Sequence, residues 1–198
     1  MLLVGDWAPG DKQVVLVHEG STVLANLEGP VLPLAHSCAA VSKAGPCLFS
    51  LAVPDKSQCF VFSLANNHIM DYGLSGLDAT LSLLAQKGFR SCGAGKDICD
   101  ARKPIICRDD DVQLGIIACC EAQFGVARRD SAGVAEFGPW VYRTIRQLRE
   151  TVEVVIVSVH AAVEDSPWPS PYIRELYRSK VIPKVKTTKR PKEIKLWL

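Results

Sequence analysis

Short, uninterrupted runs of apolar and β-branched residues, each ending at polar side chains, constrain the fold of this chain most. Four such runs lie far apart in the sequence, at residues 1–4, 21–25, 59–62 and 154–159. Uninterrupted apolar runs of this length are typical of strands that are buried on both faces. Because helical patterns occur between them, the sequence predicts an α/β protein with helices packed on a sheet.

The expected strands and helices follow from the same patterns. Strands are expected at 2–5, 13–17, 22–27, 58–64, 104–107, 112–119 and 153–159. Helices are expected at 75–87, from 139 onward and at 171–179. The three acidic residues 109–111 predict a hairpin turn. The proline-rich residues 29–57 predict a long surface excursion over the site.

The residues that follow the apolar runs are rich in carboxylates, carboxamides and imidazoles. They are Asp6, Asn26, Glu28, Asn66, Asn67, His68, Asp71, His160 and Glu164. In an open α/β sheet the carboxyl ends of the strands present the ligand-binding groups. We therefore expect these side chains to converge along one edge of the sheet, where oxygen and nitrogen donors can hold a metal ion or a phosphoryl group.

Several of these positions have an ordinary explanation as well. Asn and Asp fill turns and cap helices, so residues 63–73 could be a plain turn. Asp71 could cap the helix that follows it, or its carboxylate could orient the His68 imidazole without contacting metal or substrate itself. Glu164 could lie in a solvated turn, although its position four residues after His160 favours a role in the site. These alternatives stay open at the level of sequence.

Four strings occur in a fixed order along the chain: G-D-W-A-P, A-N-L-E-G-P, S-L-A-N-N-H-I-M-D-Y-G and V-I-V-S-V-H. Together they resemble the signatures of the CapA (PgsA-like) family of bacterial capsule and poly-γ-glutamate biosynthesis proteins, from about residue 2 to about residue 178. Members of that family look like relatives of calcineurin-like metallophosphoesterases. The resemblance therefore implies a four-layer α-β-β-α sandwich and a metal-dependent hydrolase of phosphoester type.

The resemblance also implies a role for each matching position. The metal ligands would be Asp6, Asn26, Glu28, Asn67, His160 and Glu164. The catalytic residues would be His68, which stabilises the attacked centre or protonates the leaving oxygen, and Asp71. Carboxylate and amide oxygens with imidazole suit divalent Mn, Mg, Fe or Zn. In that mechanism a water activated by the metal attacks the substrate directly.

The C-terminal end departs from the family pattern. The pattern continues after His160 into a Gly-x-His-Pro-His segment that supplies two more imidazoles. The histidines of this chain are His18, His36, His68 and His160. If that segment is missing, the last strands of the sheet that the family pattern includes would be missing as well. We therefore expect an incomplete domain at 1–178, whose metal centre is weakened, absent or reduced to one ion.

Residues 179–198 differ in composition from the rest of the chain. They contain seven Lys or Arg and one Glu, while the whole chain carries 23 basic and 21 acidic residues. Such a run can bind nucleic acid or an anionic membrane. Prolines 183 and 191 interrupt any helix, and aromatic residues are not interleaved for base stacking. The sequence therefore predicts a basic disordered tail and no binding to nucleic acid.

The eight cysteines contain no C-x-x-C pair, which is the usual sign of a structural zinc site. Cys59, Cys107, Cys119 and Cys120 lie in apolar runs and are expected to be small core residues. Free thiols and the lack of a signal peptide predict a cytoplasmic protein. No apolar stretch approaches the roughly 20 residues of a membrane-spanning helix. The resemblance implies the alternative of association with the cell envelope.

Three functions stay open on this basis. The first is a metal-dependent hydrolase that acts on an anionic phosphoester or polymer substrate during the synthesis of a cell-envelope polymer. The second is a non-catalytic binding or scaffold component that works with other capsule-synthesis proteins. The third is an inactive fragment. Metal content and turnover of a phosphodiester separate the first function from the other two.

Overall fold

The structure, a computed structural model of the 198-residue chain, describes residues 1–7, 22–32, 39–42, 47–48, 51, 59–122, 125–161, 171, 175 and 193–197. The expected strand 13–17 and nearly all of the expected helix 171–179 lie outside these residues. Much of the expected excursion at 29–57 lies outside them as well.

One four-stranded sheet is entirely parallel and has the order β1-β2-β3-β4. Its strands are β1 (Leu2–Asp6), β2 (Val23–Asn26), β3 (Phe60–Ser63) and β4 (Arg90–Cys92). All residues of β2 and β3 are buried, as the uninterrupted apolar runs predict. The three-residue strand β4 was not expected, because R-S-C carries no apolar pattern.

A second four-stranded sheet has the order β10-β9-β7-β6. Its strands are β6 (Ile105–Asp109), β7 (Val112–Cys120), β9 (Val154–His160) and β10 (Glu193–Trp197). The β6–β7 pair is an antiparallel hairpin, so the turn expected at 109–111 is confirmed, and the other pairs are parallel. Two short strands, β5 (Ala94–Gly95) and β8 (Gly133–Val134), form a separate antiparallel pair.

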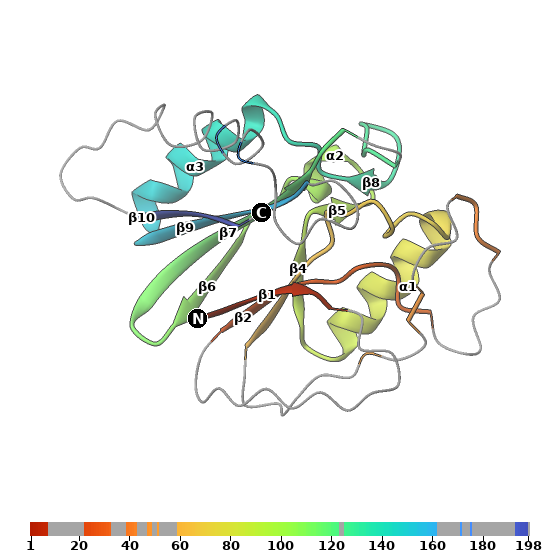
Figure 1. Cartoon of the computed structure of the whole chain (residues 1–198), viewed down its shortest axis with the longest axis horizontal. Coiled ribbons are helices and arrows are strands. Elements are labelled where there is room, and N and C mark those ends of the chain that lie inside the picture. Colours follow the sequence, from red (N-terminus) through yellow and green to blue (C-terminus); the bar gives the residue numbers. More distant parts are fainter. Residues whose placement is uncertain are drawn as a thin grey trace.

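The two larger sheets share one hydrophobic core. Side chains of β2 and β3 cluster with Leu114, Ile116 and Ile156 from one face of the second sheet. The alternate residues of β7 and β9 face the other way and pack on α3, as the period of two in a strand requires. Figure 1 shows α3 along the sheet of β9 and β10, and α1 on the other side of the molecule beside β4. The expected α/β fold is confirmed, whereas its assignment to the metallophosphoesterase type stays a prediction.

The two long helices expected from the sequence are confirmed. Helix α1 (Gly73–Gln86) buries Leu77 and Leu84, which lie two turns apart on the same face of the helix. Helix α3 (Pro139–Thr151) begins at its proline, which needs no N–H partner in the first turn, and buries Ile145 and Leu148. The single-turn helix α2 (Ile98–Ala101) was not expected; the Asp97 side chain caps it by accepting from the N–H groups of Cys99 and Asp100.

Residues 193–197 correct the expectation of a disordered tail over 179–198. They form β10, which pairs in parallel with β9 from Glu193 opposite Val154 to Trp197 opposite Ser158. Without β10 the backbone N–H and C=O groups along this side of β9 would lack strand partners. The pairing of β10 with β9 supplies these hydrogen-bond partners. Its stabilisation outweighs the repulsion among the basic residues, which predicted disorder.

The cysteines of the described residues are free thiols, and four of them lie in the core: Cys92, Cys107, Cys119 and Cys120. Burial raises the pKa of Cys92 and of Cys120 to about 12, so both thiols are protonated at neutral pH. Cys59 is exposed, so the expectation that it is a core residue is wrong. It precedes the first residue of β3 and stays outside the packed strand.

Among the described residues, the helices are all too short or too polar to cross a membrane.

Candidate metal centre

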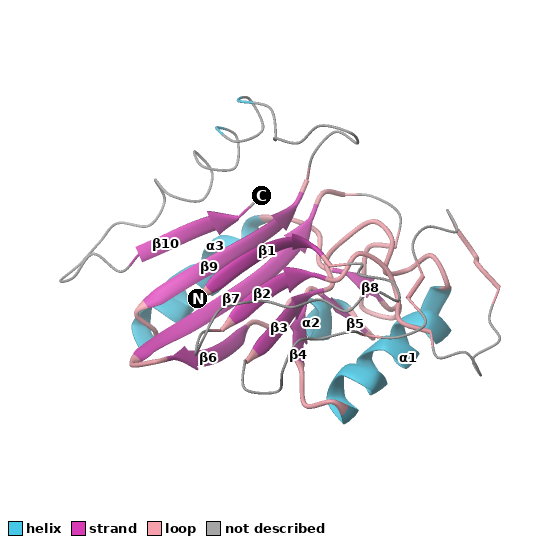
Figure 2. Ribbon diagram, turned by 60° about the horizontal axis from the view of Figure 1, so that its bottom comes forward, coloured by secondary structure: helices cyan, strands magenta, loops and turns pink. Residues whose placement is uncertain are grey.

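Three of the expected site residues are the last residues of parallel strands. Asp6 ends β1, Asn26 ends β2 and His160 ends β9. Asp6 lies opposite Asn26 in the register of β1 and β2. In Figure 2 the arrowheads of β1, β2, β3 and β9 point toward one end of the molecule. The carboxyl ends of both sheets therefore meet there, as a binding site at a sheet edge requires.

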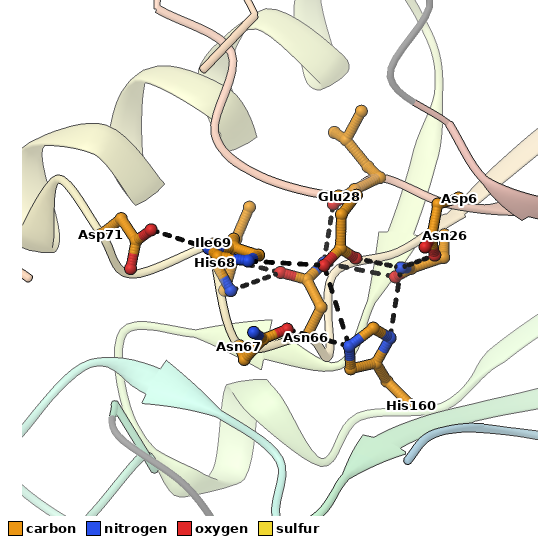
Figure 3. Close-up of polar contacts among 10 residues, drawn as sticks. Asp6, Asn26, Glu28, Asn66, Asn67, His68, Ile69, Asp71 and His160 are labelled. Atoms are coloured by element: carbon orange, nitrogen blue, oxygen red, sulfur yellow. Dashed lines mark hydrogen bonds and ion pairs between the residues drawn. The ribbon is translucent and has the colours of Figure 1, made fainter. Parts of the chain in front are cut away.

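Asp6, Glu28 and His160 form a group of three metal-ligating side chains. One ligand atom from each residue lies within 4.8 Å of the ligand atoms of the other two. Asp6 and Glu28 belong to the first sheet and its following loop, whereas His160 belongs to the second sheet. Figure 3 shows their side chains turned toward one another. Asp6 is exposed and the other two are half-buried, so the group opens to solvent.

A tight turn holds Glu28 in this position. The N–H of Gly29 donates to the carbonyl of Leu27 at 2.9 Å, and Gly29 has a φ of 116°, which favours glycine. Burial raises the pKa of Glu28 and is the largest effect on it. The imidazole of His160 opposes this, while the neighbouring Asp6 carboxylate raises the pKa further. Burial and the Asp6 carboxylate therefore outweigh the His160 imidazole in setting the pKa of Glu28.

His68 lies beside this group and is oriented by Asp71. Its Nδ1 donates to Oδ2 of the Asp71 carboxylate at 2.8 Å, and Asp71 is 1% exposed. Its Nε2 lies 4.0 Å from Oε1 of Glu28. Helix α1 begins after Tyr72 without a side-chain cap. Of the two roles open to Asp71, the structure shows the orientation of His68.

Asn67 and His160 contact each other directly. Nε2 of His160 donates to Oδ1 of Asn67 at 2.9 Å. The same imidazole nitrogen lies 3.8 Å from Oε1 of Glu28. The amide oxygen expected to bind metal therefore lies next to the group of three ligands.

Asn26 and Asn66 are buried between the strand ends. Nδ2 of Asn26 donates to Oδ1 of Asp6 at 2.7 Å and to Oε2 of Glu28. Oδ1 of Asn66 accepts from the backbone N–H groups of His68 and Ile69, so Asn66 shapes the turn that carries His68. Sequence reasoning gave Asn66 no role, although an Asn that accepts from backbone two and three residues on is a known turn signal.

The structure thus brings together every predicted site residue that it describes: Asp6, Asn26, Glu28, Asn67, His68, Asp71 and His160. Glu164 lies outside the described residues, as do the remaining histidines 18 and 36. These seven side chains lie together at the strand ends, whereas their roles as metal ligands and catalytic groups stay predictions.

Comparison with known proteins gives a match over most of the chain. The model of a family described as bacterial capsule synthesis protein PGA_cap matches residues 9–182. A probable polyglutamine synthesis accessory protein, found in two strains of Mycobacterium tuberculosis, is 35% identical over 107 residues, which are 51% of this chain and 27% of the relative. The PGA biosynthesis protein CapA of Bacillus subtilis strain 168 is 29% identical over 124 residues, 60% of this chain and 32% of the relative. The chain thus matches less than a third of the length of these curated relatives.

Proposed function

Because this chain belongs to the PGA_cap family of bacterial capsule synthesis proteins, we propose that it is a metal-dependent hydrolase of phosphoester-type bonds in the synthesis of a capsule or polyglutamate polymer. Relatives named for polyglutamine synthesis and for PGA biosynthesis support the process. The observation that carries the hydrolase is the convergence of Asp6, Glu28 and His160 from two sheets, with ligand atoms within 4.8 Å.

The donor set fits a divalent cation. Two carboxylates and an imidazole suit Mn, Mg, Fe or Zn, and Oδ1 of Asn67 lies close enough to His160 to join them. Burial raises the pKa of Glu28, and a cation bound beside this carboxylate would favour its ionised form. Such a cation lowers the pKa of a coordinated water and offsets the charge of a phosphoryl group.

His68 supplies the acid of the reaction. The buried Asp71 carboxylate accepts its Nδ1–H and so leaves Nε2 turned toward Glu28 and the site. A substrate oxygen that leaves there would take a proton from Nε2 of the imidazolium, whose Nδ1–H the Asp71 carboxylate accepts. Asn66 holds the turn through the N–H of His68, which fixes where this imidazole lies.

The proposal is tested by metal analysis of the purified chain and by hydrolysis of bis(4-nitrophenyl) phosphate with added Mn²⁺. Asp6→Ala should lose metal and turnover together, because it removes a ligand. His68→Ala should keep the metal and lower turnover by roughly 10²–10⁴-fold, the usual contribution of a general acid. Asp78→Asn is the matched control, since it removes an exposed carboxylate on α1. Loss of metal in His68→Ala would show that its role is wrongly assigned.

A non-catalytic component of the polymer-synthesis machinery is the second candidate function. It is favoured by a relative that is named an accessory protein of polyglutamine synthesis. A chain that melts cooperatively but neither holds metal nor turns over the phosphodiester would support this function. An inactive fragment would instead expose apolar surface and aggregate.

A further inference from the structure

Two asparagines lie side by side behind the candidate metal centre, and both are almost completely buried. Asn66 is 1% exposed and Asn26 is 5% exposed. A buried carboxamide carries one acceptor and two donor positions, and each must find a partner of the right kind. The partners of these two side chains decide which way each amide faces.

The orientation of Asn66 follows from its backbone partners. One end of its carboxamide lies 3.0 Å from the N–H of His68 and 2.8 Å from the N–H of Ile69. Backbone N–H groups only donate, so this end must be the oxygen. The nitrogen therefore faces the opposite way, where it donates to the carbonyl of Leu27 at 2.7 Å and to Asn26 at 3.2 Å.

The orientation of Asn26 follows from that of Asn66. The atom of Asn26 that meets the Asn66 nitrogen must be an acceptor, so it is Oδ1. Nδ2 of Asn26 is then directed at the metal centre, where it donates to Asp6 and to Glu28 and lies 3.4 Å from Nδ1 of His160. The nitrogen of a neutral carboxamide only donates, so in this orientation Asn26 offers no acceptor to a cation. A reversed Asn26 would set two nitrogen donors against each other.

We propose that Asn66 and Asn26 form an amide relay that holds the Asp6 and Glu28 carboxylates in place for a divalent cation. Asn26 is then a positioning residue and not a metal ligand, in contrast to the role that the family resemblance implies. The relay holds the two carboxylates next to each other before the cation binds. The binding energy of the cation is therefore not spent on bringing them together. This inference rests on the proposed metal centre.

Asn66→Asp breaks the relay without touching the centre. The aspartate keeps an oxygen for the N–H groups of His68 and Ile69, but its second oxygen meets the carbonyl of Leu27 and Oδ1 of Asn26, which are both acceptors. Titration calorimetry of the full chain with Mn²⁺ should show affinity lowered by roughly ten- to a hundredfold, the usual effect of removing a group that orients a ligand. An added negative charge alone would raise the affinity, so a loss identifies the relay.

Leu148→Ala is the control for general destabilisation. It removes buried apolar volume where α3 packs on the second sheet beside Gly115, near the start of β7 and away from the end of β7 that pairs with His160. It should lower the melting temperature and leave the affinity for Mn²⁺ unchanged. Each variant is titrated below its own melting temperature, so that the affinities of two folded proteins are compared.

Nuclear magnetic resonance of the wild-type chain tests the relay without any variant. Both side-chain amide protons of Asn26 should be protected from exchange in the metal-free protein and remain so after addition of Mg²⁺. Loss of that protection in either state, or unchanged Mn²⁺ affinity in a folded Asn66→Asp variant, overturns the relay. A wild-type chain that binds no Mn²⁺ overturns the proposed metal centre instead, while the metal-free spectrum still decides the orientation of Asn26.

Discussion

Glu28 is a residue of the metal centre whose pKa is raised by its surroundings. Its Oε2 accepts from Asn26, and its Oε1 lies 3.8 Å from Nε2 of His160. Burial and the neighbouring Asp6 together raise its pKa despite these partners. A carboxyl group whose pKa is raised by folding stabilises the folded state when protonated. That contribution is present below its unfolded pKa and is lost as the pH rises through the folded value.

Glu28→Gln removes this titration and keeps the size of the side chain. In EDTA, the melting temperature of the wild type should fall relative to that of Glu28→Gln as the pH rises from about 4 to about 8. With saturating Mn²⁺ at the upper pH the order should reverse, because only the wild type offers the second carboxylate. Asp78→Asn should show no pH-dependent difference. A wild type that is the more stable of the two in EDTA at about pH 8 would contradict the sign of the Glu28 shift.

The β6–β7 hairpin is the element that sets the position of the second sheet's central strand. Asp109 pairs with Val112, so the loop has two residues, and the first of them, Asp110, has a φ of 51°. β7 then pairs along β9 as far as Cys120 opposite His160. The turn thus sets the register of β6 against β7, and the separate pairing of β7 with β9 places His160 opposite Cys120.

Substitutions of the two loop aspartates, Asp110 and Asp111, should have different effects on stability. Asp110→Ala should lower the free energy of unfolding by about 1 kcal/mol, because alanine is disfavoured at positive φ. Asp110→Gly should leave it unchanged or raise it slightly, since glycine adopts this conformation without a clash. Asp111→Ala is the matched control, as Asp111 does not have a positive φ. Urea denaturation measures all three, and equal losses in both alanine variants would refute the role of the backbone at Asp110.

At the scale of the whole molecule, the proposed metal centre joins the two sheets at the carboxyl ends of their strands. Asp6 and Glu28 come from one sheet and its loop, and His160 comes from the other. A cation held by all three would tie the sheets together where their strands end. Since it binds the folded chain, its binding energy adds to stability.

Mn²⁺ should therefore raise the melting temperature of the wild type with increasing concentration, by the equivalent of about 2.7 kcal/mol at a hundred times the Kd. His160→Ala should abolish the shift, because the second sheet then offers no imidazole. His68→Ala should keep it, since His68 lies outside the group of three. Differential scanning calorimetry with Mn²⁺ and with EDTA gives the comparison, and a full shift in His160→Ala would rule out a cation shared by both sheets.

The parts of the structure that sequence reasoning found are those with a strong local signal. Uninterrupted apolar runs give the buried strands, and polar residues at their ends give Asp6, Asn67 and His160. The missed parts depend on distant partners. β10 is defined by its pairing with β9, and the direction of the Asn26 amide is set by Asn66, forty residues away. No periodicity within either segment reports those contacts.

The half-buried His160 of one sheet faces the exposed Asp6 of the other, and this arrangement has a practical consequence. Any sliding of one β-layer past the other would alter the spacing of the three donors. The visible absorption of Co²⁺ depends on its coordination. Bound Co²⁺ would therefore report a change in the relative position of the two sheets.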